Sequence, residues 1–334
     1  MKILITGGAG FIGSNLVERY ASNNNNQVTI IDNLSTGNVH NIIKYINQRN
    51  VEFIEKDICD SDITDFIVKN KFDYIYNLAC PASPYYYLKH PVQTWETNVL
   101  GVRNILNGIK GSKTKLIQSS TSEVYGCAKE IPQKENYWGN VNCIGVRACY
   151  DEGKRAAETL IFDYKRLFGV NAVVVRIFNT YGPKMDKNDG RIVSNFINQA
   201  INNKEITIYG KGKQTRSFCY IEDTVDALIG LMNKNEMINC PVNIGNPKEI
   251  KVKDIAKLIK KITNSSSKIV YYEPMKDDPP RRKPNIEYLQ YLLKWRPKVN
   301  LEDGLRKCIQ YYKEDNKKYE EEIKGDIKSR VCVS

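Results

Sequence analysis

The sequence predicts an α/β protein with a doubly wound parallel sheet and a smaller C-terminal α/β lobe. Three observations lead to this fold class. Short apolar stretches alternate with segments of helical spacing in the first half of the chain, and a glycine-rich turn joins the first stretch to the first helical segment. After residue 178 the loops become longer and richer in Gly, Lys and Pro. Strands that alternate with helices form right-handed βαβ units, so helices should cover both faces of the sheet.

The expected strands of the sheet are short and apolar, and they lie at residues 2–6, 27–31, 51–55, 72–77, 115–118 and 173–178. Helices are expected between them, at 11–20, 38–47, 62–70, 93–110 and 150–168. In the second half, helices at 192–202, 222–234, 252–262 and 301–322 alternate with short strands at 205–209 and 269–272. We expect residues 1–178 to form the sheet domain, to which the chain returns at about 221–244. Residues 179–220 and 245–320 should form the smaller lobe, and 321–334 a tail.

Composition excludes several classes of protein. The chain has 334 residues, 41% hydrophobic and 26% charged, which is ordinary for a soluble globular protein. No apolar run approaches the roughly 20 residues of a membrane span, and the first apolar run breaks at Gly7, too early for a signal peptide. Cys332 stands third from the end, whereas a prenylation box needs a cysteine fourth from the end. We therefore expect a cytoplasmic protein that does not associate with membranes.

Charge and the scarcity of certain residue types narrow the chemistry further. The net charge of +12 suits an anionic small molecule, and because no basic run carries interleaved aromatics we expect no nucleic-acid binding. With only His40 and His90, Ser-His-Asp hydrolysis and histidine-based metal sites are disfavoured. The nine cysteines are scattered without any Cys-x-x-Cys pair, so no metal site is expected.

The glycine-rich turn has the spacing Gly7-x-x-Gly10-x-x-Gly13 between the first strand and the first helix. Glycine permits the tight turn and lets a pyrophosphate approach the backbone, while the helix N-terminus supplies free N–H donors. Asp32 ends the second strand, where a carboxylate can accept hydrogen bonds from ribose hydroxyls and repel a 2′-phosphate. The following Asn33 brings no positive charge. The turn therefore predicts a Rossmann-like sheet that binds NAD rather than NADP, although Asp32 could instead cap a turn.

Further along the cofactor site, Asp57 and Ile58 follow the third strand and could meet the adenine edge, although Asp57 could equally be a turn former. The complete expected cofactor set is Gly7, Gly10, Phe11, Ile12, Gly13, Asp32, Asn33, Asp57, Ile58, Leu78, Tyr150 and Lys154.

The expected reacting groups are Tyr150 and Lys154. Tyr-x-x-x-Lys occurs five times, but only Tyr150 opens a sustained helical run, which places the phenol and the ammonium on one face. A neighbouring ammonium lowers a phenol pKa, and the resulting base can take a proton from an alcohol. Thr121 and Glu123 follow the fifth strand, at the end of the sheet where ligands bind. Thr121 could hydrogen-bond the same alcohol, or Ser and Thr here could merely cap the next loop.

Together these motifs resemble the extended short-chain dehydrogenase/reductases that modify nucleotide sugars, and within them the UDP-glucuronate decarboxylases, also called UDP-xylose synthases. The resemblance runs from residue 1 to about 315. It rests on the glycine turn, Tyr150 and Lys154, and on the segments 78–84, 120–126, 137–142, 149–155, 179–183, 189–196, 212–218 and 277–284. Related dehydratases carry Asp-Glu where this chain has Ser122-Glu123, which argues against dehydration. Val146, Ala148, Lys184 and Asn285 depart from the pattern of the subfamily.

The resemblance implies NAD-dependent decarboxylation of UDP-glucuronate to UDP-xylose, with a 4-keto intermediate and internal recycling of NADH. The implied catalytic residues are Thr121, Glu123, Tyr150, Lys154 and Arg282, with Arg281 a less favoured neighbour of Arg282. The implied substrate-binding residues are Ser122, Asn179, Arg191, Tyr209, Gln214, Arg216 and Arg282. It also implies a homodimer held by a four-helix bundle of the helices near 93–110 and 148–168. The alternatives are a UDP-uronate 4-epimerase and a catalytically idle NAD-binding regulator.

Overall fold

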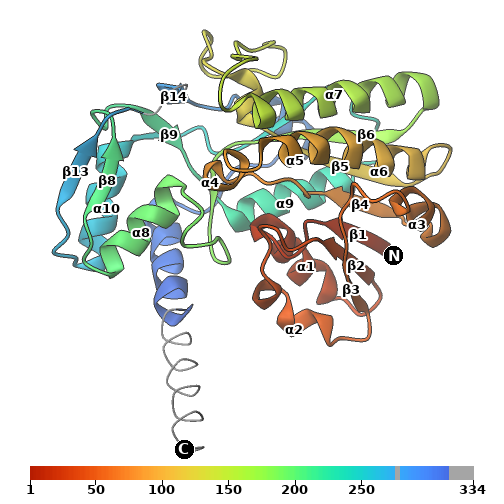
Figure 1. Ribbon diagram of the computed structural model, residues 1–334, viewed down its shortest axis with the longest axis horizontal. Coiled ribbons are helices and arrows are strands. Elements are labelled where there is room, and N and C mark those ends of the chain that lie inside the picture. The colour runs from red at the N-terminus through yellow and green to blue at the C-terminus, as the bar shows by residue number, and fades with distance from the viewer. Residues whose placement is uncertain (275–278, 316–334) are drawn as a thin grey trace, which may run out of the picture.

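The computed structural model describes residues 1–274 and 279–315. Its larger lobe is built on a parallel seven-stranded sheet with the order β11-β6-β5-β4-β1-β2-β3 (Figure 1). The strands are β1 (Lys2–Thr6), β2 (Gln27–Asp32), β3 (Val51–Glu55), β4 (Tyr74–Asn77), β5 (Lys115–Thr121), β6 (Asn171–Ile177) and β11 (Val242–Ile244). The order reverses between β1 and β4, and ligands of open α/β sheets bind at the carboxyl ends of the strands near such a switch point. The predicted α/β, Rossmann-like fold class is confirmed.

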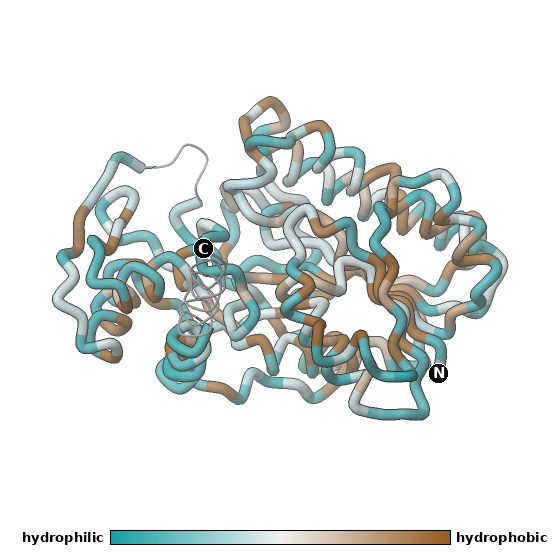
Figure 2. The backbone as a smooth tube through the Cα atoms, turned by 60° about the horizontal axis from the view of Figure 1, so that its bottom comes forward, coloured by the Kyte–Doolittle hydropathy of each residue, from teal (hydrophilic) through white to brown (hydrophobic). Residues whose placement is uncertain are grey.

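Alternating strand residues supply two separate cores, one on each face of the sheet. Ile3 and Ile5 of β1 join the core beneath α1 (Phe11–Ala21) and α9 (Ile221–Met232), whereas Leu4 joins the core beneath α3 (Ile63–Asn70), α6 (Val102–Ile109) and α7 (Ala148–Phe168). This is the period-2 pattern of strands that are buried on both faces. Figure 2 shows these strands as a hydrophobic band beside the N-terminus.

The smaller lobe holds α8 (Ile192–Ile201), α10 (Val252–Thr263) and two small sheets. One pairs β8 (Ile206–Tyr209) with β13 (Ile269–Tyr272), and the other has the order β12-β9-β14 (Glu249–Lys251, Thr215–Ser217 and Arg281–Arg282). β7 (Thr180–Tyr181) and β10 (Cys219–Tyr220) form a parallel pair between the lobes. Part of the segment 245–320, which we expected in the smaller lobe, lies on the larger lobe instead. There α11 (Glu287–Leu293) packs against β11 and α9.

Several elements differ from their predicted bounds. The expected helix at 93–110 is three consecutive pieces, α5 (Pro91–Glu96), a π-helical segment (Thr97–Gly101) and α6, with Gly101 packed closely on Ile58. The expected helix at 38–47 divides into a 3₁₀ turn (Val39–Asn41) and α2 (Ile43–Ile46). α4 (Pro84–Tyr87) and the 3₁₀ turn Ser122–Tyr125 were not predicted. β5 runs on to Thr121 because Ser119, Ser120 and Thr121 pair with β6.

At the C-terminal end, a helix covers residues 301–315 of the described chain. The rest of the expected helix to 322, the predicted tail 321–334 and residues 277–278 lie outside the described residues. Among residues 1–274 and 279–315, no helix combines the length and the apolar character that crossing a bilayer requires.

Candidate active site

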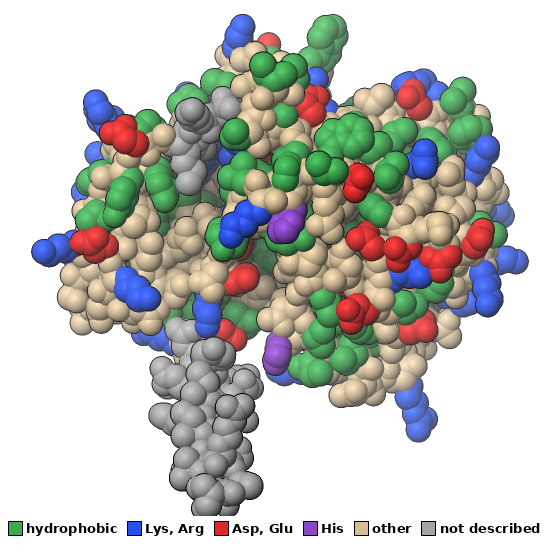
Figure 3. All heavy atoms as spheres, viewed as in Figure 1, with side chains coloured by type: hydrophobic (Ala, Val, Ile, Leu, Met, Phe, Trp, Pro, Cys, Tyr) green, Lys and Arg blue, Asp and Glu red, His purple; other side chains and the backbone are tan. Residues whose placement is uncertain are grey.

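A cavity of about 980 Å³ lies between the two lobes, where the surface in Figure 3 is hollowed. The carboxyl ends of the parallel strands open into it, and the smaller lobe closes its other side. Every site residue that the sequence singled out contributes to its wall: Gly7, Gly10, Phe11, Ile12, Gly13, Asp32, Asn33, Asp57, Ile58, Leu78, Thr121, Ser122, Glu123, Tyr150, Lys154, Asn179, Arg191, Tyr209, Gln214, Arg216 and Arg282.

The backbone of the glycine turn approaches its neighbours so closely that side chains at Gly7 and Gly13 would not fit. Gly7 has a φ of +69°, and a Cβ on Gly13 would lie 2.1 Å from the Gly7 carbonyl oxygen. α1 begins at Phe11, immediately after the turn, with no side-chain cap on its first N–H groups. A helix N-terminus left open behind a glycine turn fits the pyrophosphate of a dinucleotide.

Two acids border the cofactor side of the cavity. The carboxylate of Asp32 accepts hydrogen bonds at 2.9 Å from the backbone N–H of Ala9 and of Leu34, so it also braces the glycine turn. Burial raises its pKa, and those backbone N–H groups oppose the rise. Asp57 accepts a hydrogen bond from the Asn33 side chain at 2.7 Å, which ties the ends of β2 and β3 together. Both carboxylates face the region that the glycine turn prepares for a dinucleotide.

The phenol of Tyr150 is buried and stacks on Tyr87, with ring centroids 5.1 Å apart and an interplanar angle of 5°. Burial raises its pKa well above the usual value, while the Thr121 hydroxyl and the charge of Arg191 lower it. Lys154 donates a hydrogen bond to the Ser119 carbonyl at 3.0 Å, and its Nζ lies 5.9 Å from the centre of the Tyr150 ring. Burial outweighs the two groups that lower this pKa, Thr121 and Arg191. The lowering of the phenol pKa by the Lys154 ammonium stays a prediction.

Glu123 lies between two arginines. Both Arg147 and Arg282 donate to its Oε2 atom, and all three side chains are largely buried. Asp151 lies behind Arg147, with 3.9 Å between the Arg147 Nε and an Asp151 oxygen. The four side chains form a compact charged cluster beside Tyr150, named the arginine–carboxylate cluster below.

Strand register explains why Arg282, and not Arg281, reaches the cavity. Arg282 is paired with Arg216 and Arg281 with Thr215. Since successive strand residues point to opposite faces, Arg281 turns outward to an ion pair with Glu249 at 2.7 Å. Arg282 turns inward and is buried, and its Nε has no hydrogen-bond partner within the described residues.

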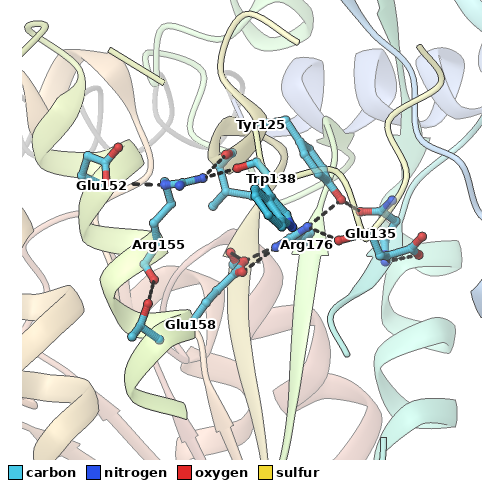
Figure 4. A network of polar contacts seen from close by, with 11 residues as sticks. Tyr125, Glu135, Trp138, Glu152, Arg155, Glu158 and Arg176 are labelled. Atoms are coloured by element: carbon cyan, nitrogen blue, oxygen red, sulfur yellow. Dashed lines mark hydrogen bonds and ion pairs between the residues drawn. The ribbon is translucent and has the colours of Figure 1, made fainter. Parts of the chain in front are cut away.

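A second polar network braces the strand end that carries Thr121 and Glu123 (Figure 4). Arg176 of β6 binds Glu158 of α7 at 2.7 Å and the Tyr125 hydroxyl at 2.9 Å. Glu158 in turn accepts a hydrogen bond from Ser120 of β5 at 2.5 Å. Arg155, also on α7, donates to the carbonyls of Val124 and Trp138. These contacts fix the 3₁₀ turn that follows β5 relative to the helix that carries Tyr150.

The remaining wall comes from the smaller lobe and the segment that leads to it. The Nδ2 atom of Asn179 is buried without a partner in the described chain, so a donor is left for a ligand. Arg216 is buried in β9, and Arg191 precedes α8 with Asp189 at 3.4 Å. Gln214 donates to the Tyr209 carbonyl at 2.7 Å. Donors and cations on this wall suit an anionic ligand.

Sequence reasoning missed three site residues: Arg147, Asp151 and Tyr87. Arg147 and Asp151 flank the Tyr-x-x-x-Lys pattern, and that position at the start of the helix was the available signal. Tyr87 follows the Cys-Pro-Ala-Ser-Pro segment, but only the fold shows that its ring stacks on Tyr150. Within the described residues, no three His, Cys, Asp or Glu side chains gather in a way that could hold a metal ion.

Comparison with known proteins places this site in a family. A family model described as GDP-mannose 4,6 dehydratase matches residues 4–308. UDP-glucuronic acid decarboxylase 3 of Arabidopsis thaliana is 48% identical over 91% of this chain and 87% of its own length. UDP-glucuronic acid decarboxylase 1 of Xenopus tropicalis is 46% identical over 94% of this chain and 72% of its own length.

Solved structures agree with these relatives. The UDP-glucuronic acid 4-epimerase from Bacillus cereus, in complex with UDP-glucuronic acid and NAD, superposes with a TM-score of 0.86 at 28% identity, covering 94% of this chain and 99% of that one. A dTDP-glucose 4,6-dehydratase from Bacillus anthracis, in complex with NAD, gives 0.84 at 25% identity over 95% and 98%. The chain therefore belongs to the GDP-mannose 4,6 dehydratase family, and within it to the group of the UDP-glucuronic acid decarboxylases.

Proposed function

We propose that this protein is a UDP-glucuronate decarboxylase, which converts UDP-glucuronate to UDP-xylose through a 4-keto intermediate. The observation that carries the proposal is the position of Tyr150 beside the pair Glu123–Arg282 on the wall of one cavity. A phenol can take a proton from an alcohol, and arginines bind carboxylates in bidentate geometry. The site thus offers a base for the sugar hydroxyl and a binding group for the carboxylate of a uronic acid. The relatives named for this reaction support the assignment.

The proposed cofactor is NAD. The glycine turn with its open helix N-terminus fits the pyrophosphate, and Asp32 is suited to the ribose hydroxyls. Asn33, Asp57, Ile58 and Leu78 complete the wall on this side. When bound, NAD would supply an acceptor and later a donor of hydride for C4 of the sugar. The carboxylate of Asp32 selects against NADP because it repels a 2′-phosphate.

The chain's own residues then divide the chemistry. Tyr150 takes the proton of the C4 hydroxyl while Thr121 holds that hydroxyl and Lys154 supplies a fixed positive charge nearby. The resulting C4 ketone lies next to C5, which bears the carboxylate, so the intermediate is a β-keto acid. The C5–C6 bond breaks, CO₂ leaves, and the electron pair moves onto the C4 oxygen. Glu123 handles protons or holds the ring near C5, and Arg282 anchors an acidic group of the substrate. After C5 gains a proton and C4 is reduced, Tyr150 returns its proton to the C4 oxygen.

The smaller lobe is proposed to hold the UDP part of the substrate. Asn179 has a buried donor without a partner, and Arg191 and Arg216 add positive charge. Ser122, Tyr209 and Gln214 supply further polar contacts along the same wall. Such a division leaves the sugar at the junction of the two lobes, beside Tyr150.

The direct test is incubation of the purified protein with UDP-glucuronate, with CO₂ and the nucleotide sugars followed together. CO₂ release in equal amount to UDP-xylose is expected. Formation of UDP-galacturonate without CO₂ would instead identify a UDP-uronate 4-epimerase. Binding of NAD without any turnover would identify an idle regulator.

We further propose a cytoplasmic homodimer, formed through α5–α6 and α7 as a four-helix bundle. These helices lie side by side on one face of the sheet (Figure 1). Val92 and Trp95 of α5 are exposed apolar side chains there. Burial of such side chains against a second copy would favour association.

A further inference from the structure

The arginine–carboxylate cluster contains one more acid than the proposed reaction uses. Glu123 accepts hydrogen bonds from Arg147 and Arg282, whereas Asp151 has only a 3.9 Å approach to the Nε of Arg147. The Oδ1 atom of Asp151 is buried and has no hydrogen-bond partner among the described residues. An ionised carboxylate in such a place is costly, because burial favours the neutral form.

The net charge of the arginine–carboxylate cluster changes when an acidic substrate binds, and this change affects Asp151. With both acids ionised, two arginines and two carboxylates sum to zero. A substrate carboxylate that enters beside Arg282 leaves the cluster with one excess negative charge in a buried place. Protonation of one acid removes this excess charge, and it costs least at the acid with the weakest hydrogen bonds and ion pairs. That acid is Asp151.

We propose that Asp151 takes up a proton when the carboxylate of the substrate binds, and so acts as a positioning residue that keeps Arg147 and Arg282 available to the incoming acid. The inference rests on the proposed function and deepens it. Decarboxylation of a carboxylate consumes one proton per turnover, because the C5–C6 bond is replaced by a C5–H bond and CO₂ departs. A proton stored at Asp151 enters with the substrate and can leave once the carboxylate has gone.

The surroundings of Asp151 agree with this role. Burial and the charge of Glu123 raise its pKa to about 7, while Arg147 and Arg282 lower it. Glu152 on the same helix adds to the rise. The charge of Asp151 in turn raises the pKa of two titratable neighbours, Tyr87 of α4 and Cys149 of α7. Since an added negative charge raises the pKa further, proton uptake on binding should be largest above pH 7, where the free site is ionised.

The test measures binding rather than turnover, in NAD-loaded protein that carries Tyr150→Phe so that no substrate is consumed. Titration calorimetry of UDP-glucuronate at pH 7.5 in two buffers of different ionisation enthalpy gives the number of protons taken up. We expect an uptake of up to about 0.75 proton per site with UDP-glucuronate, because about a quarter of the free sites already carry the proton at this pH, and near zero with UDP-xylose, which lacks the carboxylate. Adding Asp151→Asn should abolish the uptake. Asp163→Asn, which removes a carboxylate from the exposed pair with Arg166 on the same helix, is the matched control and should leave the uptake unchanged.

The pH dependence of substrate affinity provides a second test, which does not require Asp151→Asn to fold. In protein with Asp151 intact, the affinity for UDP-glucuronate should fall by up to about tenfold per pH unit above pH 7, while the affinity for UDP-xylose stays flat. Uptake that survives Asp151→Asn, or a UDP-glucuronate affinity constant from pH 6 to 8, would overturn the inference. Tight binding of UDP-xylose without any binding of UDP-glucuronate would instead refute the proposed function.

Discussion

Tyr150 and Lys154 lie one turn apart on α7, yet their polar atoms point at different partners. The Lys154 ammonium binds the Ser119 carbonyl at the end of β5, and the Tyr150 ring stacks on Tyr87. Burial therefore dominates the pKa of the phenol. The groups that lower it lie on the walls of the cavity: the Thr121 hydroxyl by a hydrogen bond, and Arg191 of the smaller lobe by its charge.

Replacing Tyr150 by Phe tests the base directly. The ring still stacks on Tyr87, so the fold and NAD binding should persist, whereas turnover should fall by about 10²- to 10⁴-fold, the usual contribution of a general base. CO₂ release and NAD binding are measured on the same preparation. Substantial turnover in the variant would remove Tyr150 from the mechanism.

Asp32 offers a test of cofactor choice. Asp32→Asn removes the charge and leaves one oxygen, which can accept from the N–H of Ala9 or of Leu34 but not from both, since each binds a different carboxylate oxygen in the wild type. Loss of a hydrogen bond to a charged group costs roughly 1.5–3 kcal/mol. NAD affinity should therefore fall and the preference for NAD over NADP should narrow. Equilibrium binding of both dinucleotides checks this, and wild-type protein that binds NADP as tightly as NAD would contradict the role of Asp32.

At the scale of elements, the register of β14 makes two adjacent arginines unequal. Arg282→Ala removes the arginine proposed to anchor an acidic group of the substrate, and a hydrogen bond to a charged group contributes about 1.5–3 kcal/mol, so kcat/KM should fall by roughly 10- to 10²-fold. Arg281→Ala is the matched control, because Arg281 is half-exposed and turns away from the cavity to pair with Glu249. Steady-state kinetics with UDP-glucuronate compares the two. Equal losses would mean that register does not decide which arginine acts.

The Arg176–Glu158 pair joins β6 to α7 and should matter for stability. Arg176→Met leaves Glu158 buried and short of a counter-charge, so the free energy of unfolding should fall by about 3–5 kcal/mol. Arg166→Met, on the exposed pair with Asp163 of α7, should cost less than about 1 kcal/mol. Urea unfolding measures both. A loss in Arg176→Met no larger than in the control would show that the network does not brace the site.

At the scale of the whole molecule, one face of the sheet carries α5, α6 and α7 with exposed apolar side chains. Trp95 is 42% exposed on α5, and Trp95→Glu should shift a dimer to monomer, because burying an unpaired carboxylate in an apolar interface is unfavourable. Tyr291→Glu is the control, since Tyr291 is 74% exposed on α11, which packs with α9 on the other face. Sedimentation velocity distinguishes the species, and a wild-type monomer at micromolar concentration would rule out the proposed dimer.

The sequence by itself determined the features that depend on local pattern. Short continuous apolar runs predicted the strands, and in the structure Ile3, Leu4 and Ile5 alternate between two buried faces. Glycine spacing predicted the turn at Gly7–Gly13, because only glycine tolerates the left-handed φ and the close backbone approach there. The Tyr150-x-x-x-Lys154 spacing placed both side chains in one helix. Resemblance then added the distant residues, such as Arg282, that no local pattern identifies.

Only the tertiary structure decided how distant charges meet. Glu123 follows β5, Arg147 and Asp151 open α7, and Arg282 belongs to a two-residue strand, so their contact depends on three separate parts of the fold. Strand register, which sequence spacing does not reveal, turned Arg282 inward and Arg281 outward. Burial is also the largest influence on the pKa of the Tyr150 phenol, because desolvation depends on everything that packs around a group and not only on its neighbour four residues away.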